Sequence, residues 1–119
     1  MNDLRAARSA LQTEITPLLE LKEDRGYEAT RVTIRKPPIN GIRKAASKVV
    51  KLLEENGNAE FAKEKNKVYD SIKASLGAID DGCRPDLARR PDLLGLLGKL
   101  VSDLDEFGKG LGIEAVTEL

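Results

Sequence analysis

The chain has 119 residues, in which 20 lysines and arginines are balanced by 20 aspartates and glutamates, and it contains no histidine. The absence of histidine excludes Ser-His-Asp and Cys-His nucleophile systems and most zinc and non-haem iron sites. A single cysteine excludes an intrachain disulfide and any CxxC pair. We therefore expect a protein with no enzymatic activity, no metal and no cofactor.

Membrane insertion is also not expected, because no run of about 18 apolar residues occurs. The N-terminal segment MNDLRAARSA lacks the apolar core of a signal peptide. Two interpretations stay open. Either the protein is cytosolic, or a targeting segment was removed from a precursor of this mature chain.

Apolar residues recur every three or four positions through most of the chain, which is typical of amphipathic helices. The pattern predicts helices over about 3–24, 27–35, 40–55 and 59–79, a loop over 80–90, and a last helix that opens at 91–93. Within them, Pro17 predicts a kink near Thr16. Gly26 is the expected left-handed end of the first helix, and Asn40 is an expected cap.

These elements predict an all-α fold, an up-down-up-down four-helix bundle with a Pro37-Pro38 break between a short helix and helix two. The whole chain, 1–119, is expected to form one domain, with residues 112–119 as a loose tail. The last helix carries the cleanest apolar stripe, composed of Leu93, Leu97, Leu100, Leu104, Phe107 and Leu111.

Few residues suggest chemistry. Asp80-Asp81-Gly82 lacks the spacing of an EF-hand loop, so these acids are expected to be solvated turn residues rather than calcium ligands. Cys83 has arginines nearby in sequence but no histidine to act as its base, which favours an incidental loop thiol. The glycines match no nucleotide-binding loop.

The one feature above background is a basic stretch without any acid between Arg31 and Lys51. It is either an ordinary solvated face that pairs with acids of the later helices, or a docking surface for an acidic partner. Nucleic acid is not the expected partner, because no aromatic residue that could stack on nucleobases lies among these basic residues. The predicted partner-binding residues are Arg31, Arg35, Lys36, Arg43, Lys44 and Lys48.

An aromatic residue, basic residues at helical spacing, and IRKPP followed by a second basic helix together resemble the second helix of PsbQ-type extrinsic proteins of photosystem II. The algal and diatom branch of these proteins is resembled at least as well. Tyr27 stands where tryptophan is expected in that family, and the loop 80–90 departs from it. The residues that carry the resemblance are Tyr27, Arg31, Ile34, Arg35, Pro37, Pro38, Ile42 and Arg43.

The resemblance implies a non-enzymatic, monomeric bundle in the chloroplast thylakoid lumen, peripheral to the membrane. Such a subunit docks on the photosystem II core and other extrinsic subunits, helps stabilise the oxygen-evolving manganese cluster and helps retain calcium and chloride. Two alternatives stay open from the residues themselves. One is a cytosolic helical adaptor or regulatory protein-binding module, and the other is a bundle that binds a small ligand or lipid.

Overall fold

A computed structural model describes residues 2–109, and every regular element in that range is helical. The elements are α1 (Asn2–Ala10), the π-helical η1 (Leu11–Ile15), α2 (Thr16–Glu20), α3 (Asp24–Ile34), the 3₁₀ turn η2 (Ile39–Gly41), α4 (Ile42–Glu55), α5 (Ala59–Gly82) and α6 (Leu93–Gly108). The all-α prediction is confirmed. Its expected tail, residues 112–119, lies outside the described residues.

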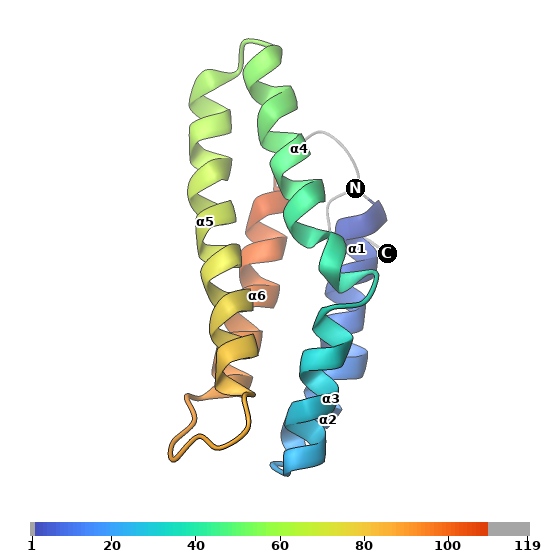
Figure 1. The fold of residues 1–119 in the computed structure, drawn as a ribbon. Coiled ribbons are helices and arrows are strands. Elements are labelled where there is room, and N and C mark those ends of the chain that lie inside the picture. Colours follow the sequence, from blue (N-terminus) through green and yellow to red (C-terminus); the bar gives the residue numbers. More distant parts are fainter. Residues whose placement is uncertain (1, 110–119) are drawn as a thin grey trace.

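The helices form an elongated body of 47 × 26 × 20 Å (Figure 1). Because η1 continues directly between α1 and α2, the described helices amount to five segments rather than four. α5 lies between α4 and α6, α2 packs against α3 and α6, and α1 packs against η2 and α4. The predicted helix ranges agree with the structure to within a few residues, but the predicted loop 80–90 starts too early, because α5 continues to Gly82.

Proline acts on the first helix differently from the prediction. Pro17 cannot donate to the carbonyl of Thr13, and its ring crowds that carbonyl. Instead of a simple kink, the preceding turn widens into the π-helix η1. There the backbone N–H of Thr16 donates to the carbonyl of Leu11, five residues back. Leu11 and Ile15 stay buried through this turn, so the apolar stripe of the first helix is preserved.

The turn between α2 and α3 corrects the expectation for Gly26. The left-handed residue is Lys22, with φ of 52°, whereas Gly26 lies in the first turn of α3. Gly26 is needed for close packing. A Cβ placed there would lie 2.4 Å from the carbonyl oxygen of Leu18. The missing side chain thus lets α3 fold back tightly against α2.

Asn40 also has a different role from the predicted one. It lies within η2, and Gly41 occupies the cap position of α4. The Asn40 side chain donates from Nδ2 to the carbonyl of Arg35 at 3.1 Å. This bond satisfies a carbonyl at the end of α3, across the cis Pro37-Pro38 peptide bond.

The other helix ends follow the sequence. Gly57, with φ of 79°, terminates α4, and the Asp92 carboxylate accepts the backbone N–H of Gly95 at 3.0 Å to cap α6. The helices share one apolar core, to which α6 contributes the described part of its predicted stripe. These buried residues are Leu93, Leu97, Leu100, Leu104 and Phe107.

Candidate functional site

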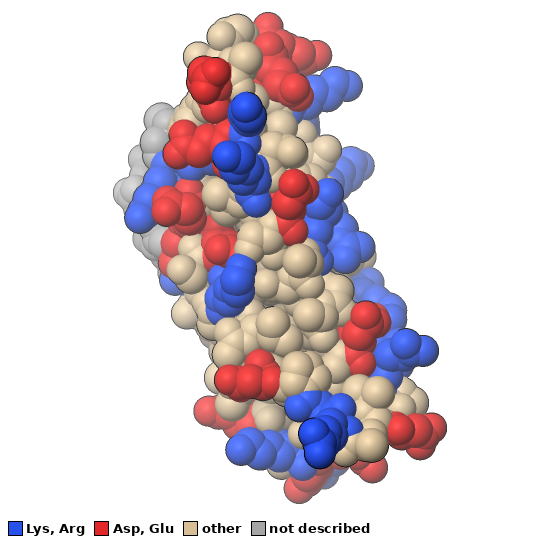
Figure 2. Space-filling view, turned by 90° about the vertical axis from the view of Figure 1, so that its left-hand side faces the viewer, with Lys and Arg blue, Asp and Glu red and all other residues tan. Residues whose placement is uncertain are grey.

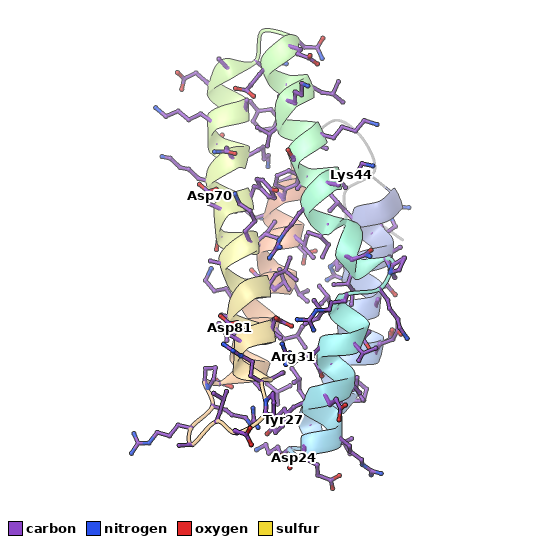
Figure 3. The ribbon with its side chains drawn as sticks, viewed as in Figure 1. Asp24, Tyr27, Arg31, Lys44, Asp70 and Asp81 are labelled. Atoms are coloured by element: carbon purple, nitrogen blue, oxygen red, sulfur yellow. The ribbon has the colours of Figure 1, made fainter. Side chains whose placement is uncertain are left out.

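The first part of the basic stretch is held inside the fold by a single aspartate. Arg31 and Arg35 are one helical turn apart on α3 and face the end of α5. Arg31 Nε lies 3.4 Å from Asp80 Oδ1, and Arg35 Nη2 lies 3.0 Å from Asp80 Oδ2. Arg35 also donates to the carbonyl of Arg31 at 3.2 Å. Figure 3 shows Arg31 between α3 and α5. These two arginines therefore tie α3 to α5.

The second part, on α4, is different. Arg43, Lys44 and Lys48 are exposed, and none forms an ion pair with another described residue. Lys51 is also exposed and forms no ion pair with another described residue, and Leu52, four residues after Lys48, is 47% exposed. In Figure 2 lysine and arginine side chains gather along the right-hand edge, toward the side on which α3 and α4 lie. We call Arg43, Lys44, Lys48 and Lys51 the α4 cationic face.

Lys36 stands between the two groups. It is exposed just before Pro37, and among residues 2–109 it has no ion-pair partner. The six predicted partner-binding residues thus do not form one uniform surface. Two of them neutralise Asp80, and the other four leave their charges in solvent.

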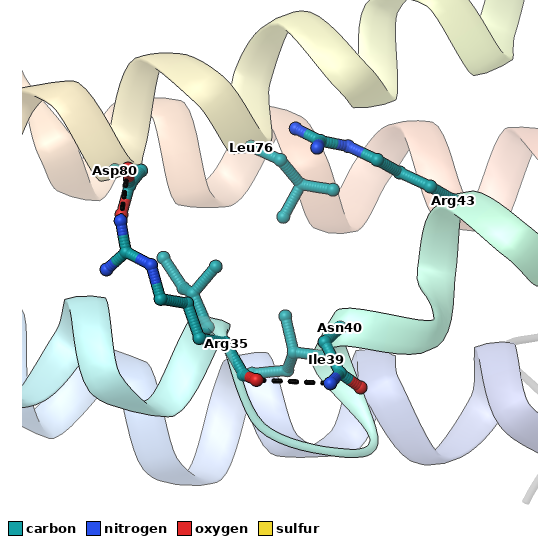
Figure 4. A pocket seen from close by; sticks show the side chains of 7 residues that line it. Arg35, Ile39, Asn40, Arg43, Leu76 and Asp80 are labelled. Atoms are coloured by element: carbon teal, nitrogen blue, oxygen red, sulfur yellow. Dashed lines mark hydrogen bonds and ion pairs between the residues drawn. The ribbon is translucent and has the colours of Figure 1, made fainter.

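A cleft of about 360 Å³ opens where the two groups meet (Figure 4). Its apolar lining comes from Ile34, Ile39 and Leu76. The Arg35–Asp80 pair stands at one end of the cleft, and Arg43 reaches toward Leu76 from the other. The cleft therefore joins an apolar floor to Arg43, which forms no ion pair with another described residue.

Sequence reasoning missed Arg90, which fixes the segment after α5. Its guanidinium lies 4.1 Å from the ring centre of Tyr27, a cation–π contact. Nη1 donates to the carbonyls of Gly82 at 2.9 Å and Arg84 at 2.7 Å. A second cleft of about 330 Å³ lies beside these groups. With its hydrogen bonds made to the fold, Arg90 is a structural residue.

Cys83 is not a reactive thiol. Its side chain is buried, and burial raises its pKa to about 11, against a weaker opposing effect of Arg90. Since the thiolate is the nucleophile, a thiol with this pKa is almost entirely protonated at neutral pH. Cys83 was expected to be an incidental thiol in a loop. The structure places its side chain in the hydrophobic core.

Lys65 is the one charged residue in the described core. Its Nζ donates to the carbonyl of Glu106 at 2.8 Å, near the end of α6, and lies 5.1 Å from the ring centre of Phe61. Desolvation lowers the pKa of Lys65, and nearby glutamates oppose that change. The same carbonyl also accepts the backbone N–H of Lys109, so Lys65 adds a second hydrogen bond there and links α5 to the end of α6.

A serine beside a lysine is a nucleophile pair in some hydrolases, and Ser71 and Lys99 form such a contact here. The Ser71 hydroxyl donates to Asp103 Oδ2 at 2.5 Å, and Lys99 Nζ lies 3.1 Å from the same oxygen. The Lys99 side chain is 55% exposed. An exposed, ion-paired amine is poorly placed to act as a base. These contacts instead join α5 to α6 at the protein surface.

No metal site is formed by the part of the chain that the structure describes. Within residues 2–109 no group of three or more acidic or cysteine side chains is close enough to hold an ion. The expectation that Asp80 is a solvated turn residue is wrong, because it lies in the last turn of α5 and its carboxylate pairs with Arg31 and Arg35. In the same range, none of the helices has the length and apolarity needed to cross a bilayer.

Comparisons with protein-family models, with curated proteins and with solved structures found no match for this chain.

Proposed function

We propose that this protein is a non-enzymatic docking subunit whose α4 cationic face binds the acidic surface of a larger assembly. The observation that carries the proposal is the exposure of Arg43, Lys44 and Lys48 without an ion-pair partner in the described structure. Charges left in solvent on one helix face steer association and fix the register of a complex. Basic residues that stabilise the fold have an acidic partner, as Arg31 and Arg35 have in Asp80.

The partner proposed is the lumenal side of photosystem II. Support comes from the sequence pattern around Arg31, Pro37 and Arg43, which resembles PsbQ-type extrinsic proteins. In this proposal α3 and α4 together act as the second rod of a four-helix bundle, broken at Pro37-Pro38. The subunit would help stabilise the manganese cluster and retain calcium and chloride, without chemistry of its own. Its targeting peptide would precede this chain in the precursor.

The test compares two charge reversals of equal size. Lys44→Glu with Lys48→Glu changes the α4 cationic face, whereas Lys63→Glu with Lys67→Glu makes the same change at the same spacing on α5. All four lysines are exposed and have no ion pair with another described residue. Rebinding to salt-washed photosystem II membranes is measured for both variants. We expect the α4 variant to bind about tenfold more weakly, and the α5 variant to bind like wild type.

Salt supplies a second readout of the same proposal. Screening over a Debye length of about 8–10 Å at moderate ionic strength should release wild type from the membranes. Equal binding by both variants, together with binding that ignores salt, would contradict the role of the α4 cationic face. If wild type does not bind photosystem II at all, that partner is wrong, and the cytosolic adaptor takes its place.

A further inference from the structure

The cleft beside the α4 cationic face combines an apolar floor with a basic residue at its rim. Ile39 and Leu76 are 2% and 5% exposed and form a floor with Ile34. Arg43 stands at the rim, exposed and without an ion pair in the described structure. An apolar floor next to a free guanidinium suits a ligand that is apolar at one end and anionic at the other.

The charges around the cleft favour an anion rather than a cation. Asp80 is the only acid that lines it, and this carboxylate already accepts Arg31 and Arg35. Its two partners compensate its charge, so the field that an entering group meets at the far end is that of Arg43. Asn40 Nδ2 is also committed, because it donates to the carbonyl of Arg35.

The shape of the cleft is fixed by the same contacts. The Arg35–Asp80 ion pair joins α3 to α5 at one end, and the Asn40–Arg35 bond ties η2 to the end of α3 (Figure 4). The walls therefore come from helices that are already connected in the folded protein. A partner would enter a preformed site and would not need to order it, which lowers the entropic cost of binding.

We propose that this cleft binds a short acidic segment of the docking partner. A large apolar side chain of that segment lies on Ile34, Ile39 and Leu76, and a neighbouring carboxylate pairs with Arg43. At about 360 Å³ the cleft has room for one large side chain and its flanking backbone. It lies near the lower limit of small-molecule sites, roughly 300–1,000 Å³. The proposal rests on the proposed function, since it identifies how the same partner is recognised.

A protein segment fits better than a free small carboxylate because Arg43 belongs both to the cleft and to the α4 cationic face. Lys44 follows Arg43 directly, and Lys48 lies one turn further along the helix. A chain that anchors one apolar side chain in the cleft can continue along α4 with further acidic residues. A single small molecule would leave that adjacent charge unused.

The experiment uses three synthetic peptides and isotopically labelled protein. The first peptide has one phenylalanine flanked by glutamates, the second replaces the phenylalanine with alanine, and the third replaces the glutamates with glutamine. Backbone amide shifts are followed by NMR during titration. We expect the first peptide to shift amides in 34–43 and 76–80, and each of the other two to bind about tenfold more weakly.

Two neighbouring variants separate the cleft from general attraction to a basic helix. Arg43→Gln should weaken the first peptide about tenfold and remove the preference for glutamate over glutamine, whereas Lys44→Gln should keep that preference. Both residues are exposed, so both variants are expected to fold. Equal behaviour of the two variants, shifts confined to the outside of α4, or no binding of the first peptide at millimolar concentration would each overturn the proposal.

These results are independent of the membrane test. If the peptide pattern appears but wild type does not rebind to photosystem II, the partner is wrong and the cleft stands. If wild type rebinds and the α4 charge reversal weakens it, while the peptides show no preference, the docking function stands and the cleft assignment falls.

Discussion

Two groups of basic residues flank Pro37-Pro38, and the structure uses them in opposite ways. On α3, Arg31 and Arg35 close an ion-pair network on Asp80, whose side chain is 25% exposed. On α4, Arg43, Lys44 and Lys48 leave their charges in solvent. The groups look alike in sequence. They differ because Asp80, at the end of α5, lies within ion-pair distance of Arg31 and Arg35, whereas no ion pair joins the α4 residues to another described residue.

The number of charges in a segment is therefore not the number available to a partner. Charges with a half-buried internal partner stabilise the fold, and exposed ones can act in recognition with little effect on stability. The two functions can therefore be separated by mutation.

Loss of the close packing under α3 should have the largest effect. Gly26→Ala places a methyl group against the carbonyl oxygen of Leu18, a backbone atom that cannot move aside cheaply. We expect a loss of about 3 kcal/mol in unfolding free energy, at the upper end of overpacking costs. The measurement is urea denaturation followed by circular dichroism.

The matched control is Gly98→Ala on α6, where an added Cβ meets no atom within 4 Å. There the better helix propensity of alanine should raise stability by about 0.8 kcal/mol. A Gly26→Ala protein as stable as the control would mean that α3 is not held against α2 in the way described.

Alkaline pH should weaken the same end of the molecule through Cys83. Its pKa is raised from 9.0 to about 11 in the folded state, so its contribution to stability is complete below pH 9. The contribution is lost as pH rises toward 11, because the unfolded chain gives up the proton first. The expected loss is about 2 kcal/mol by pH 11. Lys65 has a lowered pKa and thus the opposite sign.

Comparison with Cys83→Ala isolates the thiol, since Lys65 is common to both proteins and cancels. Urea denaturation at a series of pH values should give a difference in stability that falls between pH 9 and 11. A difference that stays constant through this range would show that the thiol ionises as easily in the folded protein as in the unfolded chain.

Removal of the Asp80 carboxylate should leave Arg31 and Arg35 without an ion-pair partner, as Arg43, Lys44 and Lys48 are in the described structure. Asp80→Asn breaks both ion pairs, and we expect a stability loss of about 1 kcal/mol, because the pairs are only partly shielded from solvent. Asp81→Asn is the control, since Asp81 is exposed and has no ion pair in the described structure. If both variants lose the same stability, the network on Asp80 contributes nothing.

Neutralising the α4 cationic face should have the smallest effect on the fold. Lys44→Gln with Lys48→Gln removes two exposed charges that touch no acid among residues 2–109. We expect the unfolding free energy to change by less than about 0.5 kcal/mol. A larger loss, measured by thermal and urea denaturation, would place these lysines with Arg31 and Arg35 as stabilising residues.

Helix positions were predictable because the local sequence carries them. The recurrence of apolar residues every three or four positions, the glycine after α4 and the aspartate before α6 all act within one or two helical turns. Pro17 predicted an irregularity in the first helix. Its form, a π-helical turn that keeps Leu11 and Ile15 buried, depends on packing against the other helices. Lys22 has the left-handed conformation, whereas Gly26 packs closely against α2, and local sequence indicates neither.

The candidate site was predictable only in part, because pairing depends on contacts distant in sequence. Arg35 and Asp80 are 45 residues apart, and nothing near Arg35 indicates that it is neutralised. Arg90 gave no signal, since its partners are backbone carbonyls, the ring of Tyr27 and Asp24, which is distant from it in sequence. Basic residues could be nominated from the sequence. The division between internal and exposed ones required the fold.

The buried amine of Lys65 gives the protein a built-in reporter of local opening. Lys63 and Lys67 flank it on α5 and are exposed, whereas Lys65 is 3% exposed and bonded to the carbonyl of Glu106. An amine-reactive label should modify the two neighbours at once and reach Lys65 only when the end of α6 separates from α5. The labelling of Lys65 relative to Lys63 and Lys67 therefore measures how often that end opens, and whether a bound partner holds it closed.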